Sequence, residues 1–136
     1  MRRPNVILIT CDQLRADALG CLGNPNVRTP NLDRMARDGV CFANAQATSA
    51  LCVPSRTSLY TGLYPHQHGL LQQNNGWKNS LCADLSGSIV ALMREQGYRT
   101  GMVGRNGFAE EGEIRRCFDD VRIRDREPQG VRFFWP

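Results

Sequence analysis

One stretch of the chain reads Thr48-Ser49-Ala50-Leu51-Cys52-Val53-Pro54-Ser55-Arg56-Thr57-Ser58-Leu59-Tyr60-Thr61-Gly62. Pro54 favours the first turn of an α-helix and Gly62 favours a helix end, so the stretch predicts a loop followed by a helix over Pro54–Thr61. Cys52 is then expected just ahead of the helix N-terminus, where exposed N–H groups stabilise negative charge. Arg56 is expected about one turn away on the same face. This arrangement suits an anionic ester substrate, and it also fits a buried cysteine beside a surface arginine.

The rest of the chain alternates between apolar runs and helical patterns. Strands are predicted at Asn5–Thr10, Val40–Ala47 and Tyr98–Val103, the first as a buried central strand because it is continuous and β-branched. This order of elements predicts an α/β fold with a mostly parallel sheet flanked by helices, containing at least three strands and three helices.

Two more helices carry clear start and stop signals. Thr29 and Pro30 mark the start of one helix, with Leu32, Met35 and Ala36 expected to face inward. Ser86 or Ser88 is expected to cap the other, which carries the apolar residues Ile89, Val90, Leu92 and Met93 and stops at Gly97. In the central helix, Leu59 is expected to make the clearest contact with the core.

Composition narrows the class of protein. The net charge of +4 comes almost entirely from scattered arginines, with Lys78 the only lysine, which argues against nucleic-acid binding. The six cysteines form no C-x-x-C pair and no zinc-binding spacing, so those other than Cys52 are expected to be free core thiols. The apolar run Val6–Ile9 is too short for a signal peptide or a membrane span. A cytoplasmic, reduced protein that does not bind membranes is expected.

The sequence changes character near its end. Residues 109–136 mix charges of both signs, Val121-Arg122-Ile123-Arg124 alternates as an edge strand does, and the chain ends in Phe133-Phe134-Trp135-Pro136. Adjacent aromatic residues at a terminus make a poor surface unless something covers them. We therefore divide the chain into an α/β segment at 1–108 and a charged C-terminal extension at 109–136, and expect the chain to be a truncated part of a longer fold.

Several segments together resemble the type I sulfatases of the alkaline phosphatase superfamily. The core of the resemblance is Cys52-x-Pro54-x-Arg56 running into Thr61-Gly62. The family's order and spacing also hold for Pro4–Ile9 followed by Asp12–Asp17, for Thr29–Ala36 and for Gly62–Gly69. The resemblance extends from Pro4 to about Gly104, and it implies the N-terminal portion of an alkaline-phosphatase-like sandwich.

This resemblance implies a divalent metal, usually calcium, with magnesium or manganese as alternatives. Asp12 and Gln13 directly follow the first predicted strand and offer oxygen ligands, with residue 52 as a third ligand. Many members have a second aspartate in place of Gln13. Calcium takes about six to eight oxygens, and the family's remaining ligands come from later sequence. A non-catalytic fragment with half a site is therefore an alternative.

The resemblance also implies that a formylglycine-generating maturation enzyme converts Cys52 to an aldehyde. One hydroxyl of the aldehyde hydrate would attack the sulfur or phosphorus of the ester and form a covalent intermediate. The second hydroxyl would then lose its proton and expel sulfate or phosphate while the aldehyde forms again. Arg56 would hold the oxyanion, and the metal would lower the hydroxyl pKa. The implied activity is that of a sulfuric ester hydrolase.

One segment departs from the family pattern. Many sulfatases have Gly-Lys-Trp-His after the third predicted strand, whereas this chain has Gly104-Arg105-Asn106-Gly107-Phe108. Arg105 is expected to bind substrate in place of the lysine, with Asn75 or Asn74 also facing it. Because phosphonate monoester and phosphodiester hydrolases also lack that Lys/His pair, they are the alternative enzyme class. His66 and His68 are expected to hydrogen-bond the loop beneath the site.

Overall fold

The computed structural model describes residues 3–72, 82 and 84–123. The chain divides into two compact units, Met1–Gln46 and Ala47–Pro136. The predicted domain boundary at 108/109 lies within the second unit, and the described residues on both sides of it belong to that unit. The boundary itself stays a prediction. Among the described residues, every helix is too short or too polar to cross a membrane.

The first unit holds three short helical elements: η1 (Ala16–Ala18), η2 (Gly20–Leu22) and α1 (Pro30–Asp38). Asp33 links two of them, because its Oδ1 accepts hydrogen bonds from the Cys21 amide at 2.8 Å and from the Thr29 hydroxyl at 2.7 Å. Thr29 occupies the predicted N-cap position of α1, but its hydroxyl contacts Asp33 and the Gly20 amide and does not cap a helix N–H. Polar contacts thus organise this unit.

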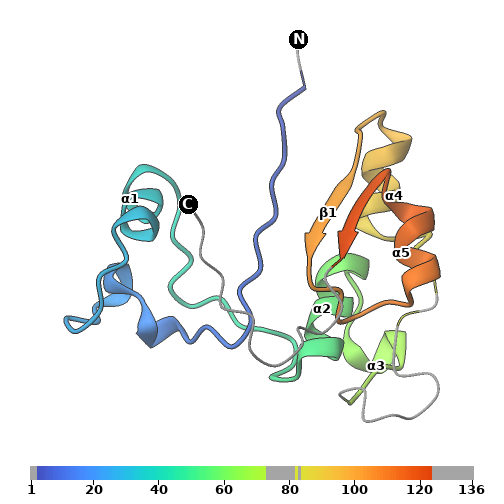
Figure 1. Ribbon diagram of the computed structural model, residues 1–136. Helices are drawn as coiled ribbons and strands as arrows, with labels where there is room; N and C mark the ends of the chain where they lie inside the picture. The colour runs from blue at the N-terminus through green and yellow to red at the C-terminus, as the bar shows by residue number, and fades with distance from the viewer. Residues whose placement is uncertain (1–2, 73–81, 83, 124–136) are drawn as a thin grey trace, which may run out of the picture. The chain divides into compact units, whose positions relative to one another are not determined.

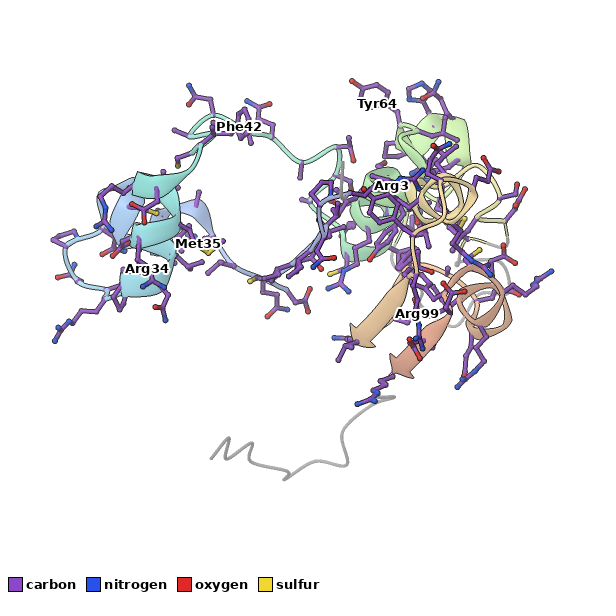
Figure 2. All side chains as sticks on the ribbon, turned by 90° about the horizontal axis from the view of Figure 1, so that it is seen from above. Arg3, Arg34, Met35, Phe42, Tyr64 and Arg99 are labelled. Atoms are coloured by element: carbon purple, nitrogen blue, oxygen red, sulfur yellow. The ribbon has the colours of Figure 1, made fainter. Side chains whose placement is uncertain are left out.

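Several predictions for the first unit are wrong. Asn5–Thr10 and residues 40–47 form no strand, and the side chains of Val6, Ile7, Leu8 and Ile9 are 53–81% exposed. An apolar run becomes a strand only where a neighbouring strand pairs with its backbone through hydrogen bonds. Among the described residues, neither segment has such a neighbouring strand. Leu32 and Met35 of α1 are exposed rather than buried. Phe42, in the segment after α1, extends from the chain in Figure 2 and is also exposed.

The second unit contains the sheet and most of the helices. Its elements are α2 (Cys52–Thr61), α3 (Pro65–His68), α4 (Ile89–Glu95), β1 (Gly101–Gly104), α5 (Glu111–Cys117) and β2 (Asp120–Ile123). Ser88 caps α4 as predicted, since its Oγ accepts the Ala91 amide at 3.3 Å. Gly62 ends α2 with φ 73°, in the left-handed region that favours glycine. The helices therefore begin and end close to their sequence signals.

Strands β1 and β2 pair in parallel and confirm an α/β fold. The register joins Gly101 to Asp120 and Gly104 to Ile123, and Figure 1 shows the two strands side by side with both arrows pointing the same way. Helix α5 provides the crossover that parallel strands require. Among the described residues the sheet has two strands rather than the three expected.

Among the residues that the structure describes, an apolar cluster forms the core of the second unit. Phe108 and Ile114 are 1% and 0% exposed, and Leu85 is 0% exposed. The full cluster is Cys82, Leu85, Val90, Met102, Phe108, Ala109, Ile114, Cys117 and Phe118. Two predicted core thiols, Cys82 and Cys117, belong to it, whereas Cys11 and Cys41 are exposed. Leu59 is 48% exposed, so its predicted core contact is wrong; Val53, Thr57 and Ser58 carry the buried face of α2 instead.

Candidate active site

Helix α2 positions the two residues on which the sequence prediction depends. Cys52 is the first helical residue, with Leu51 as N-cap, so the prediction that it precedes the helix is wrong by two positions. The loop before it is held by the Ser49 hydroxyl, which accepts the Leu51 amide at 3.1 Å. Cys52 and Arg56 are both half-buried and one turn apart, and this places a thiol and a guanidinium on one face of the helix.

Tyr60 continues this face by one more turn. Its ring stacks on Phe108 with centroids 4.2 Å apart and an interplanar angle of 5°. Burial raises the pKa of Tyr60, and the positive charge of Arg56 opposes that rise. The Tyr60–Phe108 stack thus lies on the helix face that also carries Cys52 and Arg56.

The segment after β1 meets Arg56. Nη1 of Arg56 donates a hydrogen bond to the carbonyl oxygen of Arg105 at 3.4 Å, across 49 positions of sequence. A Cβ built on Gly107 would lie 3.4 Å from the same nitrogen and 3.9 Å from Cζ. Two of the predicted site residues, Arg56 and Arg105, are thus brought together, with the backbone of the second in contact with the side chain of the first.

Asn106 holds this segment in a tight turn. Its Nδ2 donates to the Ala109 carbonyl at 2.6 Å, and its Oδ1 accepts the amides of Phe108 and Ala109, both at 3.3 Å. The sequence reasoning missed Asn106 and Gly107 as turn residues, although an Asn-Gly pair shortly after a strand is a recognisable turn signal.

Beneath the site, His68 joins α3 to α2. The Leu70 amide donates to Nδ1 at 3.2 Å, and Nε2 lies 3.0 Å from the Ser58 hydroxyl. His68 therefore has the loop-bonding role that the sequence predicted. His66 is exposed and its ring stacks beside Tyr64 at a centroid distance of 5.8 Å.

Thr57 carries a buried hydroxyl that has no hydrogen-bond partner among the described residues. Its side chain is 0% exposed, and Oγ1 finds no hydrogen-bond partner among the residues that the structure describes. Its backbone carbonyl accepts the Thr61 hydroxyl at 2.7 Å. Burial of a hydroxyl without a partner costs free energy, so Thr57 is a position where an apolar residue of the same shape is expected to be tolerated.

Asp12 and Gln13 lie in the first unit, in a turn where both side chains are exposed. Gln13 has φ 56°, a left-handed conformation that is uncommon for a residue with a side chain. Within the described ranges, no group of three His, Cys, Asp or Glu side chains could hold a metal ion. A cleft shared by Asp12 and Cys52 stays a prediction, and Asn74 and Asn75 fall outside the described residues.

Comparison with known proteins identifies the class. The sulfatase family model matches residues 4–126. An N-acetylgalactosamine-6-O-sulfatase of Bacteroides thetaiotaomicron is 42% identical over 108 residues, which cover 76% of this chain and 20% of the relative. An arylsulfatase of Clostridium perfringens is 36% identical over 124 residues, covering 90% and 24%. Human arylsulfatase H is 37% identical over 112 residues, covering 76% and 20%.

The chain belongs to the sulfatase family. It corresponds to the N-terminal part of the type I members and spans only about a fifth to a quarter of the length of these three relatives.

Proposed function

We propose that this chain carries the nucleophile-bearing part of a sulfuric ester hydrolase centre. The observation that carries the proposal is the face of α2, where Cys52 in the first turn and Arg56 one turn later are both half-buried, and where Arg56 contacts the Arg105 carbonyl. Membership of the sulfatase family supports the same reaction class, as do three relatives named as sulfatases.

The modification of Cys52 is the central element of the proposal. As formylglycine, residue 52 would supply an aldehyde hydrate whose hydroxyl attacks the ester. The N-terminal N–H groups of α2 would stabilise negative charge at this residue, since Cys52 and Val53 occupy the first two helical positions. A formylglycine-generating enzyme is then a required partner.

Arg56 would bind the sulfate group of the substrate. A guanidinium is planar and always charged, so it binds a tetrahedral oxyanion through two parallel N–H donors. Arg105 would add a second positive charge in place of the family's lysine, and Asn75 is proposed as a further substrate contact. The half-buried setting of Arg56 supports the role because electrostatic interactions strengthen where water is partly excluded.

Asp12 and Gln13 would hold the metal. A carboxylate and an amide oxygen are ligands of the kind that calcium accepts, and magnesium or manganese accept them too. The left-handed φ of Gln13 also fits a functional loop, where uncommon backbone conformations concentrate. When bound, the metal would supply charge neutralisation and a lowered hydroxyl pKa.

A phosphonate monoester or phosphodiester is the second candidate substrate. The segment Gly104-Arg105-Asn106-Gly107 carries no histidine that could act as a general acid, and Gln13 stands where many sulfatases have aspartate. The alternative of a non-catalytic fragment stays a prediction. The cytoplasmic location expected from the sequence stays a prediction.

The test is co-expression of the full chain with a formylglycine-generating enzyme, followed by peptide mapping by mass spectrometry. The proposal expects an aldehyde at residue 52, none in Cys52→Ala, and an unchanged aldehyde yield in Cys41→Ala, which removes an exposed thiol elsewhere. Unmodified Cys52 would contradict it. Turnover of p-nitrophenyl sulfate and of a nitrophenyl phosphodiester, with and without calcium, then separates the sulfatase, the phosphodiesterase and the inactive fragment.

A further inference from the structure

The segment Arg105–Phe108 is fixed at both ends. It leaves β1 at Gly104, and at its far end the Cys82 amide donates to the Phe108 carbonyl at 2.7 Å. The Glu110 amide donates in turn to the Cys82 carbonyl at 3.1 Å, which makes an isolated parallel bridge between Cys82 and Ala109. The backbone between these anchors has little freedom left.

The side chain of Asn106 further restricts the backbone of this segment. Its amide group makes three hydrogen bonds, one to the Ala109 carbonyl and two from the amides of Phe108 and Ala109. The side chain thus supplies hydrogen-bond partners to backbone groups that a turn of this kind would otherwise leave unpaired. The position of the Arg105 carbonyl and of the Gly107 backbone follows from this turn.

Both of those groups contact the guanidinium of Arg56. The Arg105 carbonyl accepts its Nη1 at 3.4 Å, and the position of a Gly107 Cβ would lie 3.4 Å from that nitrogen. Gly107 does not have a left-handed φ, so its backbone conformation is open to other residues. A Cβ at position 107 would be in van der Waals contact with the guanidinium, so the further methyl groups of a branched side chain would compete with the guanidinium for the same space.

We propose that Asn106 and Gly107 are positioning residues, which hold the Arg56 guanidinium in the orientation that binds the anionic group of the substrate. Asn106 acts by aiming the Arg105 carbonyl, and Gly107 by leaving room for the guanidinium. The anion-binding part of this inference rests on the proposed function of Arg56, whereas the positioning part depends on the contacts alone.

The experiment follows the Nε–Hε signal of Arg56 in the ¹⁵N-labelled full chain by NMR, with the signal assigned by its loss in Arg56→Lys. Asn106→Ala and Gly107→Val are expected to shift this signal and to speed exchange of its proton. Gly87→Val is the matched control, since Gly87 also lacks a left-handed φ and a Cβ there has no atom within 4 Å. Asn106→Asp keeps the two acceptor contacts and is expected to give a smaller shift than Asn106→Ala.

Titration with sodium sulfate at constant ionic strength gives the second readout. Sulfate affinity is expected to fall by about threefold to tenfold in Asn106→Ala and Gly107→Val, the size expected when one hydrogen-bonding group is misplaced. Gly87→Val is expected to bind sulfate as the parent chain does.

The outcomes are distinguishable. An Arg56 signal that stays unchanged in folded Asn106→Ala and Gly107→Val overturns the positioning role. A signal that moves in both variants, in a parent chain that binds no sulfate, supports the positioning role and overturns the anion-binding role. Should Asn106→Ala not fold, Gly107→Val still decides the role of Gly107, and an unchanged Arg56 signal in Asn106→Asp, which loses the bond to the Ala109 carbonyl, overturns the role of Asn106.

Discussion

The hydroxyl of Ser58 lies 3.0 Å from Nε2 of His68, and this contact ties α3 to the buried face of α2. The Leu70 amide donates to Nδ1 of the same ring at 3.2 Å. Because Nδ1 accepts, the neutral imidazole carries its proton on Nε2 and donates it to Ser58, an assignment that follows from the hydrogen bonds. Through this contact, His68 helps to hold in place the helix that carries Cys52 and Arg56.

Removal of this support is expected to destabilise the second unit. His68→Ala loses two hydrogen bonds, and we expect the free energy of unfolding to fall by about 1–3 kcal/mol. Urea unfolding followed by far-UV circular dichroism measures the change. His66→Ala, which removes the exposed histidine of α3, is the control and should cost less than about 0.5 kcal/mol. Equal losses in the two variants would contradict the role given to His68.

Phe108 is expected to be a major contributor to the stability of the second unit. It is 1% exposed and stacks on Tyr60, so Phe108→Ala should lower the free energy of unfolding by about 3–5 kcal/mol. Phe42→Ala is the matched control, since Phe42 is 78% exposed and its loss should cost less than about 0.5 kcal/mol. Thermal unfolding of both variants tests the difference, and a Phe108→Ala variant as stable as Phe42→Ala would refute it.

Thr57→Val is expected to stabilise the protein or leave it unchanged. The substitution keeps the shape of the side chain and removes a buried hydroxyl that has no partner in the described part of the chain, so a gain of up to about 1 kcal/mol is expected. Thr61→Val is the control, because it deletes a hydroxyl that donates to the Thr57 carbonyl at 2.7 Å, and it should cost about 1 kcal/mol. A clear loss of stability in Thr57→Val would show that its hydroxyl has a partner.

The carboxylate of Asp119 is expected to make the stability of the second unit depend on pH. The Thr100 amide donates to its Oδ2 at 2.8 Å, and this hydrogen bond holds the pKa of Asp119 below its usual value near 3.8. A lowered folded-state pKa gives stability that is present above the unfolded-state pKa and is lost as the pH falls through the folded-state value. Asp119→Asn should therefore destabilise the protein at pH 7 and have less effect at pH 3.

Urea unfolding at the two pH values measures this difference. Asp38→Asn is the control, since the Arg37–Asp38 pair is exposed and contributes little at either pH. An Asp119→Asn penalty that is the same at pH 7 and pH 3 would contradict the assignment.

Local signals in the sequence predicted α1, α2 and α4, but they did not predict α3 or α5. A helix end is set by residues within one turn of it, so neighbouring residues are enough to reveal it. The examples here are the glycines Gly62 and Gly97 after two helices and the cap residue Ser88 before one. The alternation that starts at Val121 likewise predicted β2, whose described part ends at Ile123. Such signals need no knowledge of the rest of the fold.

Features that depend on distant partners were harder to predict. The run from Val6 to Ile9 has the composition of a strand, but no strand forms there among the described residues, because strand formation requires a neighbour. The contact between Arg56 and the Arg105 carbonyl spans 49 positions, and spacing alone could not reveal it. The family resemblance suggested that both residues serve one site, but it did not reveal the turn that Asn106 makes between them.

The Asp33 contacts in the first unit have a consequence for how that unit responds to its surroundings. No side chain between residues 3 and 46 is buried, so its cohesion depends on hydrogen bonds to which water has access, such as those from Cys21 and Thr29. Bonds of this kind open easily, whereas an apolar core opens only by cooperative unfolding. Amide protons of the first unit should therefore exchange with deuterium long before those of Phe108 and Ile114, and a protease should cut first on the side of the chain that precedes Cys52.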